Sequence, residues 1–326
     1  MTRNNGAHPR RAFLSRRFPD PVEERIAERY HLVRNPANRI LTGDELAQAA
    51  RGCQYIFISA MEQVPRVVFE ELAGTLEAVA TMSVGFNHID LEAAREFGVA
   101  VFYSPGVLSD ACAELAVMLL LNAARRGSEA DRLVRSGQWT GYAPTQLLGV
   151  GLVGRRAGIL GMGRIGQAVA RRLKPFGVEL HYHNRTRLEQ EREEGAIYHA
   201  SAESLLQVSD FLLVCTPGAT ELANFLNRER IALLPPRAIV VNVSRGDTIE
   251  DDALIEALKS GHLFAAGLDV FANEPQVDPR YLTMPNVFLT PHIASATVDT
   301  RSAMGFILLD GLAAWEQGVT LENRLC

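Results

Sequence analysis

Short runs of apolar residues recur along the whole chain, and stretches with helical spacing separate most of them. Most of the later runs are apolar at every position, as expected for strands covered by helices on both faces. Strands that alternate with helices predict parallel βαβ units and therefore an α/β protein. The predicted strands are residues 12–15, 31–34, 55–59, 77–81, 99–103, 158–160, 178–183, 196–200, 211–215, 238–243, 264–268 and 287–290.

Helix start signals lie between these strands. Pro21 begins a helical pattern, Thr42 is followed three residues later by Glu45, and Asp90 precedes another helical stretch. The first hundred or so residues therefore predict a small α/β domain. Residues 109–126 predict a long helix, which is nearly apolar all round and should be buried. A last helix is predicted over residues 299–317.

A glycine-rich loop follows the strand at residues 158–160 and precedes a helix and a second strand. This order turns a weak GxGxxG match into a predicted dinucleotide site. Gly161 permits the tight turn, Gly163 lets the backbone approach a pyrophosphate, and Gly166 lets helix and strand pack closely. Free N–H groups at the helix start would face the phosphates. The alternative is a glycine-rich turn that binds nothing. The loop consists of Gly161, Met162, Gly163, Arg164, Ile165 and Gly166.

The end of the second strand indicates which dinucleotide binds. An NAD site usually has an Asp or Glu about twenty residues after the loop, where it binds the ribose 2′-hydroxyl. This chain instead has Asn184, Arg185, Thr186 and Arg187 there. Arg185 can bind a 2′-phosphate, Arg187 adds positive potential, and the other two add neutral hydrogen-bonding groups. We therefore expect NADPH to be preferred, with NADH also possible, although a solvated basic turn is the alternative.

Composition narrows the class of protein further. The 326 residues carry a net charge of −5, with a pI of about 5.9, which does not favour a nucleic-acid partner. The four cysteines are scattered without metal-ligand spacing, so we expect no metal site and reduced thiols in a cytoplasmic protein. No apolar helical stretch is long enough to span a membrane. Five arginines make the start basic, and a transit peptide is the alternative interpretation there.

Ligands of an open parallel sheet bind beyond the carboxyl ends of its strands. Unusual polar residues follow four of the predicted strands, and we expect them to border the cofactor or the substrate. The four segments are Cys215-Thr216-Pro217, Asn242-Val243-Ser244-Arg245, Asp269 with Glu274 a few residues on, and His292-Ile293-Ala294-Ser295.

Three of these residues suit the reduction of a ketone next to a carboxylate. The guanidinium of Arg245 can bind the carboxylate with two hydrogen bonds and polarise the carbonyl. His292 can give a proton to the oxygen, and Glu274 can keep that imidazole protonated. Alone, Arg245 could be a cap, His292 a structural histidine and Glu274 a solvated charge. Their shared placement behind a dinucleotide loop favours the catalytic interpretation.

The chain resembles the D-isomer-specific 2-hydroxyacid dehydrogenase family along almost its whole length. The resemblance implies catalytic roles for Arg245, Glu274 and His292, and N–H groups of Val84 and Gly85 that bind the substrate carboxylate. It also implies that Asp269 lies near the nicotinamide carboxamide. The matching motifs are Ser83-Val84-Gly85-Phe86-Asn87-His88-Ile89-Asp90, Ser104-Pro105-Gly106-Val107-Leu108, the glycine loop, Val243-Ser244-Arg245-Gly246, Leu268-Asp269-Val270-Phe271-Ala272-Asn273-Glu274-Pro275 and Pro291-His292-Ile293-Ala294-Ser295-Ala296-Thr297.

The resemblance further implies two Rossmann-like domains. A doubly wound parallel-sheet coenzyme domain, residues 105–295, would be inserted into a discontinuous flavodoxin-like substrate domain, residues 1–104 and 296–326. The last helix would return to the first domain. Family members are commonly homodimers held together through their coenzyme domains.

Within that family the chain looks most like glyoxylate/hydroxypyruvate reductases, which reduce small 2-oxo acids. The residues that support this are 184–187 and the stretch 139–149. Tyr142 stands where some hydroxypyruvate reductases have a second Trp that reaches the partner's site. The alternatives are a dehydrogenase of phosphoglycerate, D-lactate or a bulkier acid and, in a different class, a nucleotide-sensing scaffold without activity.

Overall fold

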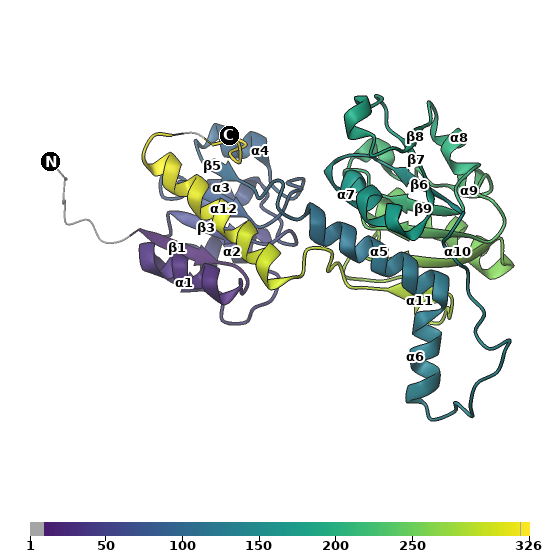
Figure 1. Cartoon of the computed structure of the whole chain (residues 1–326). Helices are drawn as coiled ribbons and strands as arrows, with labels where there is room; N and C mark the ends of the chain where they lie inside the picture. Colours follow the sequence, from purple (N-terminus) through teal and green to yellow (C-terminus); the bar gives the residue numbers. More distant parts are fainter. Residues whose placement is uncertain (1–9, 320) are drawn as a thin grey trace. The chain divides into compact units, whose positions relative to one another are not determined.

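The computed structural model describes residues 10–319 and 321–326 of the chain. They form two compact units. The first unit comprises Met1–Leu108 and Ala296–Cys326, and the second comprises Ser109–Ser295. Figure 1 shows the two units and the helix that brings the end of the chain back to the first one.

The first unit is built on a five-stranded sheet in the order β2-β1-β3-β4-β5, and every strand pair in it is parallel. This is the flavodoxin-like strand order. The strands are β1 (Arg11–Leu14), β2 (His31–Arg34), β3 (Tyr55–Ile58), β4 (Ala78–Thr81) and β5 (Ala100–Phe102). The helices are α1 (Asp20–Arg29), α2 (Gly43–Ala49), α3 (Arg66–Glu71), α4 (Leu91–Glu96) and α12 (Val298–Glu316).

Helices cover both faces of this sheet. Leu46 of α2 and Val68 of α3 join one apolar core, and Ile26 of α1 and Leu308 of α12 join the core on the other face. All four residues of β3 are buried, which explains why its sequence is apolar at every position. The predicted start signals have the expected effect, since Thr42 forms a capping box with Glu45 at the start of α2.

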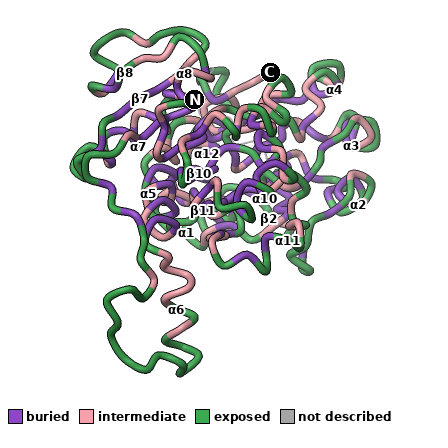
Figure 2. The backbone as a smooth tube through the Cα atoms, turned by 90° about the vertical axis from the view of Figure 1, so that its right-hand side faces the viewer, coloured by how far each residue is buried: buried purple, intermediate pink, exposed green. Residues whose placement is uncertain are grey.

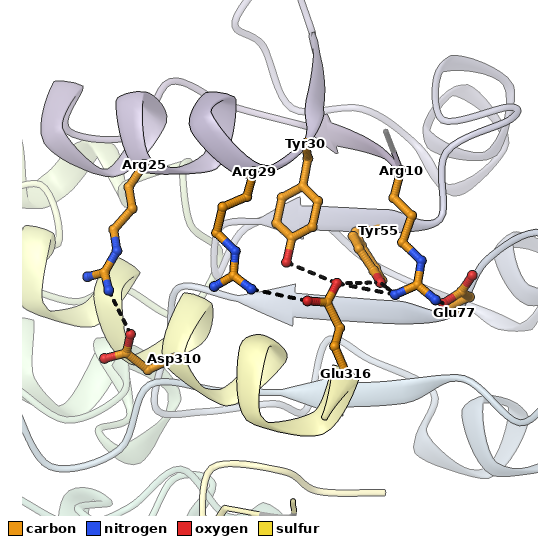
Figure 3. Close-up of polar contacts among 8 residues, drawn as sticks. All are labelled: Arg10, Arg25, Arg29, Tyr30, Tyr55, Glu77, Asp310 and Glu316. Carbon is orange, nitrogen blue, oxygen red and sulfur yellow. Dashed lines mark hydrogen bonds and ion pairs between the residues drawn. The ribbon is translucent and has the colours of Figure 1, made fainter. Parts of the chain in front are cut away.

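A polar cluster near its C-terminal end fixes α12 to the first unit (Figure 3). Oε1 of Glu316 accepts hydrogen bonds from the hydroxyls of Tyr55, at 2.8 Å, and Tyr30, at 3.2 Å. Arg10 Nη1 lies 3.2 Å from the same oxygen, and Arg29 Nη2 lies 3.1 Å from Oε2. Burial, together with the Glu316 carboxylate, raises the pKa of both tyrosines. The last helix therefore belongs to the first unit.

The second unit has a seven-stranded sheet in the order β12-β11-β10-β9-β6-β7-β8, again parallel throughout. The strands are β6 (Arg156–Leu160), β7 (Glu179–His183), β8 (Ile197–Tyr198), β9 (Phe211–Val214), β10 (Ala238–Asn242), β11 (Leu263–Leu268) and β12 (Val287–Leu289). The helices are α5 (Ser109–Arg125), α6 (Gly127–Arg135), α7 (Arg164–Leu173), α8 (Ala202–Leu206), α9 (Arg228–Ile231), α10 (Asp251–Ser260) and α11 (Pro279–Leu282), with short 3₁₀ turns at Lys174–Phe176, Gln190–Arg192, Thr220–Leu222 and Gly246–Thr248.

This sheet too is covered on both faces. Residues of α5 and α7 contribute to one apolar core, and residues of α8, α9 and α10 contribute to the other. The strand order reverses between β6 and β9, which is where an open parallel sheet binds its ligand. The glycine loop follows β6 and therefore lies at this point. The α/β fold class predicted from the sequence, with two Rossmann-like domains, is confirmed.

Two elements differ from the sequence-based expectation. The edge strand β8 has only two residues, where five were expected, and both of them pair with β7. The helix expected over residues 109–126 ends at Arg125, because Arg126 has a left-handed backbone with φ of 56° and a new helix, α6, begins after it. The side chain of Met118 on α5 is 41% exposed, so this helix is buried on one face only.

None of the residues of α6 is buried. Figure 2 shows α6 and the segment that follows it in the colours of half-buried and exposed residues. Among the described helices, none has both the length and the apolar character needed to cross a membrane.

Candidate active site

The glycine loop after β6 has the geometry that its three glycines predict. Gly161 has a left-handed backbone with φ of 96°, and a Cβ there would lie 2.8 Å from the backbone nitrogen of Thr216. A Cβ on Gly166 would lie 2.3 Å from the carbonyl oxygen of Gly161. A Cβ on Gly163 would meet no atom within 4 Å. Two glycines are therefore required by the fold, while the third borders open space of the kind that a pyrophosphate needs.

The first turn of α7 is suited to an anion. The helix begins at Arg164 without a side-chain cap, and no acidic residue lies in its first turn. Its leading N–H groups and the helix dipole therefore favour a phosphate. Asn184 supports the loop from the end of β7, because its Oδ1 accepts a hydrogen bond of 2.6 Å from the backbone N–H of Met162. Sequence reasoning placed Asn184 beside the cofactor and did not foresee this contact.

The two arginines after β7 differ in their surroundings. Arg187 Nε lies 2.7 Å from Glu193 Oε1, so a carboxylate already balances its charge. Glu193 also accepts a hydrogen bond of 2.8 Å from the hydroxyl of Tyr182. Arg185 is exposed and has no ion-pair partner in the part of the chain that the structure describes. Of the two, Arg185 is the cation that remains available to a 2′-phosphate.

The loops after β9 and β10 are joined to each other. Ser244 Oγ donates a hydrogen bond of 2.7 Å to the carbonyl of Thr216, and the two hydroxyls lie 3.0 Å apart. Asn242, at the end of β10, accepts from the N–H of Ser244 and donates to the carbonyl of Arg245. These bonds hold the neighbours of Cys215, Pro217 and Val243 in a fixed shape at the carboxyl edge of the sheet.

Arg245 follows this hydrogen-bonded turn after β10, and its side chain is exposed to solvent. Its Nη1 donates 2.8 Å to the carbonyl of Ser244, and the residue is exposed. No carboxylate forms an ion pair with it in the described ranges, 10–319 and 321–326. A positively charged fork with most of its donors unpaired is a suitable site for a substrate carboxylate.

His292 and Glu274 form a pair at the same edge of the sheet. His292 Nδ1 lies 2.6 Å from Glu274 Oε2, and Glu274 Oε1 accepts a hydrogen bond of 2.9 Å from the N–H of Phe271. Burial alone would raise the pKa of Glu274. The hydrogen bond from His292, the bond from Phe271 and the charges of His292 and Arg245 outweigh burial and lower that pKa. Glu274 is therefore an anion at neutral pH, next to an imidazole.

The backbone at His292 is unusual. Its φ is 53°, a left-handed conformation that costs a non-glycine residue about 1 kcal/mol or more. Nε2 of His292 has no hydrogen-bond partner among the described residues, and the side chain is 39% exposed. The ring is thus fixed at one nitrogen and open at the other, as a proton donor must be.

Asp269 holds the turn that carries His292. Its Oδ1 accepts hydrogen bonds from the hydroxyl of Thr290, at 2.6 Å, and from the N–H of Ile293, at 2.8 Å. Its Oδ2 accepts 3.0 Å from the N–H of Ala294. Burial raises the pKa of Asp269, although these bonds oppose the shift. The sequence singled out Asp269 by its place after a predicted strand, and the resemblance placed it near the nicotinamide carboxamide. The structure adds that Asp269 maintains the strained turn at His292.

Comparison with known proteins decides the family. Residues 117–294 match the D-isomer specific 2-hydroxyacid dehydrogenase family, NAD binding domain. A glyoxylate reductase of Thermococcus litoralis is 37% identical over 96% of this chain and 96% of its own length. The chain belongs to the D-isomer-specific 2-hydroxyacid dehydrogenase family.

Solved structures agree with this family. A putative D-isomer specific 2-hydroxyacid dehydrogenase from Polaromonas sp. JS6 66 is 54% identical, with a TM-score of 0.96, over 97% of this chain and 99% of that one. An NADPH-dependent glyoxylate/hydroxypyruvate reductase from Sinorhizobium meliloti, in complex with NADP and malonate, is 35% identical, with a TM-score of 0.83, over 98% of this chain and 97% of that one. The family recognised from the sequence motifs is confirmed, and the protein is an NAD(P)-dependent D-2-hydroxyacid dehydrogenase.

The remaining predicted site residues lie in both units of this dehydrogenase. Ser295 is half-buried and is the last residue of the second unit. Val84 and Gly85 belong to the first unit, in the loop that follows β4. Of the predicted catalytic residues, Arg245, Glu274 and His292 all lie in the second unit, and two of them are in direct contact.

Proposed function

We propose that this dehydrogenase reduces small 2-oxo acids, glyoxylate or hydroxypyruvate foremost, to D-2-hydroxy acids, and that it prefers NADPH. The observation that carries the proposal is the His292–Glu274 pair, which has one imidazole nitrogen held at 2.6 Å and the other open. The curated relative from Thermococcus litoralis is a glyoxylate reductase, which supports the choice of substrate class.

The chain's own groups account for binding and proton transfer. Arg245 binds the substrate carboxylate and orients the neighbouring carbonyl. In the first unit, the N–H groups of Val84 and Gly85 are the proposed donors to a substrate carboxylate. When bound, the reduced nicotinamide supplies a hydride to the carbonyl carbon. His292 gives the proton on Nε2 to the carbonyl oxygen, so that the ketone becomes a secondary alcohol. Glu274 holds Nδ1–H and stabilises the protonated ring before the transfer.

The cofactor would lie along the segments described above. The glycine loop and the start of α7 hold the pyrophosphate, Arg185 and Thr186 meet the adenosine ribose, and the loops after β9, β10 and β11 border the nicotinamide side. The unpaired Arg185 and the lack of a carboxylate at residues 184–187 support NADPH. The relative from Sinorhizobium meliloti is itself described as NADPH-dependent.

A matched pair of variants tests the cofactor preference. Arg185→Ala should raise the KM for NADPH about tenfold or more and leave that for NADH nearly unchanged, because one charge-assisted contact is worth about 1.5–3 kcal/mol. Arg187→Ala is the control, since Glu193 already pairs with that arginine. Equal losses with both cofactors in Arg185→Ala would contradict the assignment of this residue to the 2′-phosphate.

Steady-state assays test the substrate class. Glyoxylate, hydroxypyruvate, pyruvate and a bulkier 2-oxo acid would each be measured with NADPH and with NADH. We expect the two smallest, most polar acids to give the highest kcat/KM with NADPH. Highest efficiency with the bulky acid would favour a different dehydrogenase of the same family. Retained NADPH binding without turnover of any acid would favour a nucleotide-sensing scaffold.

We also propose that the enzyme is a homodimer held through its second unit. Helix α6 has no buried residue, and the chain around it exposes large apolar side chains that a partner would cover. Sedimentation equilibrium should report twice the mass of one chain, and charged substitutions at Val134 and Leu148 should reduce it to one. The exposed side chains are Val134, Trp139, Tyr142, Leu148 and Val153.

The cysteines support a cytoplasmic location. All four are free, and three of them are buried. Burial raises the pKa of the Cys112 and Cys215 thiols to about 12, so neither is a reactive thiolate at neutral pH. Fractionation of cells that make the protein should recover the activity in the cytoplasmic fraction.

A further inference from the structure

Three side chains, one at the end of β4 and two in the loop that follows it, form a chain of hydrogen bonds that ends on the backbone of Gly85. Nε2 of His88 lies 3.0 Å from Oγ1 of Thr81, which lies 2.7 Å from Oγ of Ser83. Ser83 Oγ in turn donates 2.6 Å to the carbonyl oxygen of Gly85. Thr81 is fully buried and Ser83 nearly so, which means that water cannot take the place of these partners.

The chain of bonds has only one consistent direction. Ser83 has one hydroxyl hydrogen, and the carbonyl of Gly85 can only accept it. The hydroxyl of Thr81 must therefore donate to Ser83, which leaves its oxygen to accept from His88. Nε2 of His88 thus carries a hydrogen that fixes the orientation of both hydroxyls.

The hydrogen bond from Ser83 to the carbonyl of Gly85 fixes the orientation of the peptide between Gly85 and Phe86. Because a trans peptide places its C=O and N–H on opposite sides, a carbonyl of Gly85 held towards Ser83 turns the N–H of Phe86 the other way. The N–H groups of Val84, Gly85 and Phe86 have no acceptor among residues 10–319 and 321–326. The loop therefore offers consecutive donors, while its nearest acceptor is turned away, which favours an anion.

Other bonds hold the two ends of this loop in place. The N–H of Ser104 donates 2.9 Å to the carbonyl of Ser83, and the N–H of Val64 donates 2.8 Å to the carbonyl of His88. Between these anchors, the N–H of Ile89 donates 3.0 Å to the carbonyl of Phe86. Among the described residues, the hydroxyl of Ser83 is the group that donates to the carbonyl of Gly85. Loss of that contact would free the peptide to turn without unfolding the sheet beside it.

We propose that His88, Thr81 and Ser83 are positioning residues that keep the loop of Val84 and Gly85 in its anion-binding orientation, and so set the affinity for the 2-oxo acid carboxylate. The proposal rests on the proposed function, and it adds three residues that do not touch the substrate. None of the three is needed for proton transfer or for the cofactor. Their loss should therefore weaken carboxylate binding and leave the other steps intact.

The main variant is Thr81→Val, which keeps the shape of the side chain and removes the middle hydroxyl from the chain of hydrogen bonds. We expect the KM for glyoxylate and the inhibition constant of oxamate, a carboxylate that is not reduced, to rise together about tenfold, which corresponds to about 1.4 kcal/mol. The kcat should fall less than about threefold, and the dissociation constant of NADPH should not change. Thr81→Ser restores the hydroxyl and should restore both values.

Ser83→Ala removes the final bond and tests the same claim if Thr81→Val does not fold. Its matched control is Ser15→Ala, because Ser15 is also fully buried in the first unit and its hydroxyl has no partner among the described residues. The control should keep the wild-type KM. Circular dichroism and thermal melting would verify that each variant is folded.

The two proposals fail in different ways. A wild-type enzyme that reduces no 2-oxo acid refutes the proposed function, while calorimetric binding of oxamate to the NADPH complex still tests the loop. A wild-type enzyme that is active, with folded Thr81→Val and Ser83→Ala variants whose oxamate affinity is unchanged, refutes the positioning role alone. Equal losses of oxamate affinity in Ser83→Ala and Ser15→Ala would show that Ser83 acts only through core packing, and would also refute the positioning role.

Discussion

Glu316 in the first unit and Glu274 in the second are both carboxylates held by cationic or polar groups, but their surroundings differ. Two arginines and two tyrosines bind Glu316 and satisfy both of its oxygens. Glu274 binds one backbone N–H and one imidazole, whose other nitrogen is open to solvent. The first arrangement fastens a helix, and the second leaves an atom that can exchange a proton. The difference between a structural and a catalytic carboxylate therefore lies in whether its partner keeps an unpaired polar atom.

The sharpest test of this difference removes the open nitrogen. His292→Ala should lower kcat by about two to four orders of magnitude, the usual contribution of a positioned acid, and should leave NADPH binding unchanged. His262→Ala is a control in the same unit, because its Nε2 hydrogen-bonds the backbone carbonyl of Ile231. Stopped-flow measurement of NADPH oxidation would give both values. A loss below about tenfold for His292→Ala would remove it from the proton-transfer step.

The corresponding change at the other carboxylate should act on stability instead. Glu316→Ala leaves the polar groups around it without their shared partner, so the unfolding free energy should fall by about 2 kcal/mol and the Tm by about 4–8 °C. Asp310→Ala, which breaks an exposed pair with Arg25, should cost less than about 1 kcal/mol. Scanning calorimetry measures both. A Glu316→Ala enzyme with normal Tm but reduced kcat at 25 °C would reverse the assignment of roles.

Glu274→Gln should have an intermediate effect. The amide keeps the size of the side chain and loses the charge that stabilises the protonated imidazole, so kcat should fall about tenfold at neutral pH, or about 1.4 kcal/mol. A kcat equal to that of the wild type, measured under the same conditions, would show that the carboxylate only packs against the ring.

The smallest expected effect is the contribution of Glu274 to the pH dependence of the unfolding free energy. The folded state lowers the pKa of Glu274 from its ordinary value of 4.5. Its contribution to stability is therefore present above that value and is lost as pH falls through the lower folded pKa. The difference in unfolding free energy between wild type and Glu274→Gln should therefore shrink as pH falls below 4.5. Urea unfolding at each pH measures it, and a constant difference would contradict the lowered pKa.

Much of the fold was predictable because its signals are local. Buried parallel strands read as continuous apolar runs, and the requirement for Gly161 and Gly166 follows from the turn and close packing that a strand–loop–helix unit imposes. Helix α6 was missed because the break before it depends on a left-handed Arg126, a conformation that no local residue preference indicates.

The residues of the site could be predicted from the sequence, but the contacts between them could not. Sequence placed Arg185 and Arg187 together beside the cofactor, and only the fold shows that Glu193 pairs with one of them. It likewise gave no sign that Asp269 binds the turn of His292, or that His88 reaches Thr81. Each of these contacts depends on which loops the sheets bring together, and a pattern along one chain does not contain that information.

The position of α12 has a consequence for synthesis on the ribosome. The second unit is one uninterrupted stretch of chain, whereas the first needs a helix that emerges last. Leu308, Leu309 and Leu312 of that helix complete an apolar core whose other members were translated before residue 103. A released chain that ends before residue 298 would therefore contain the whole second unit, joined to a first unit whose apolar face lacks its covering helix, and such exposed apolar surface promotes aggregation.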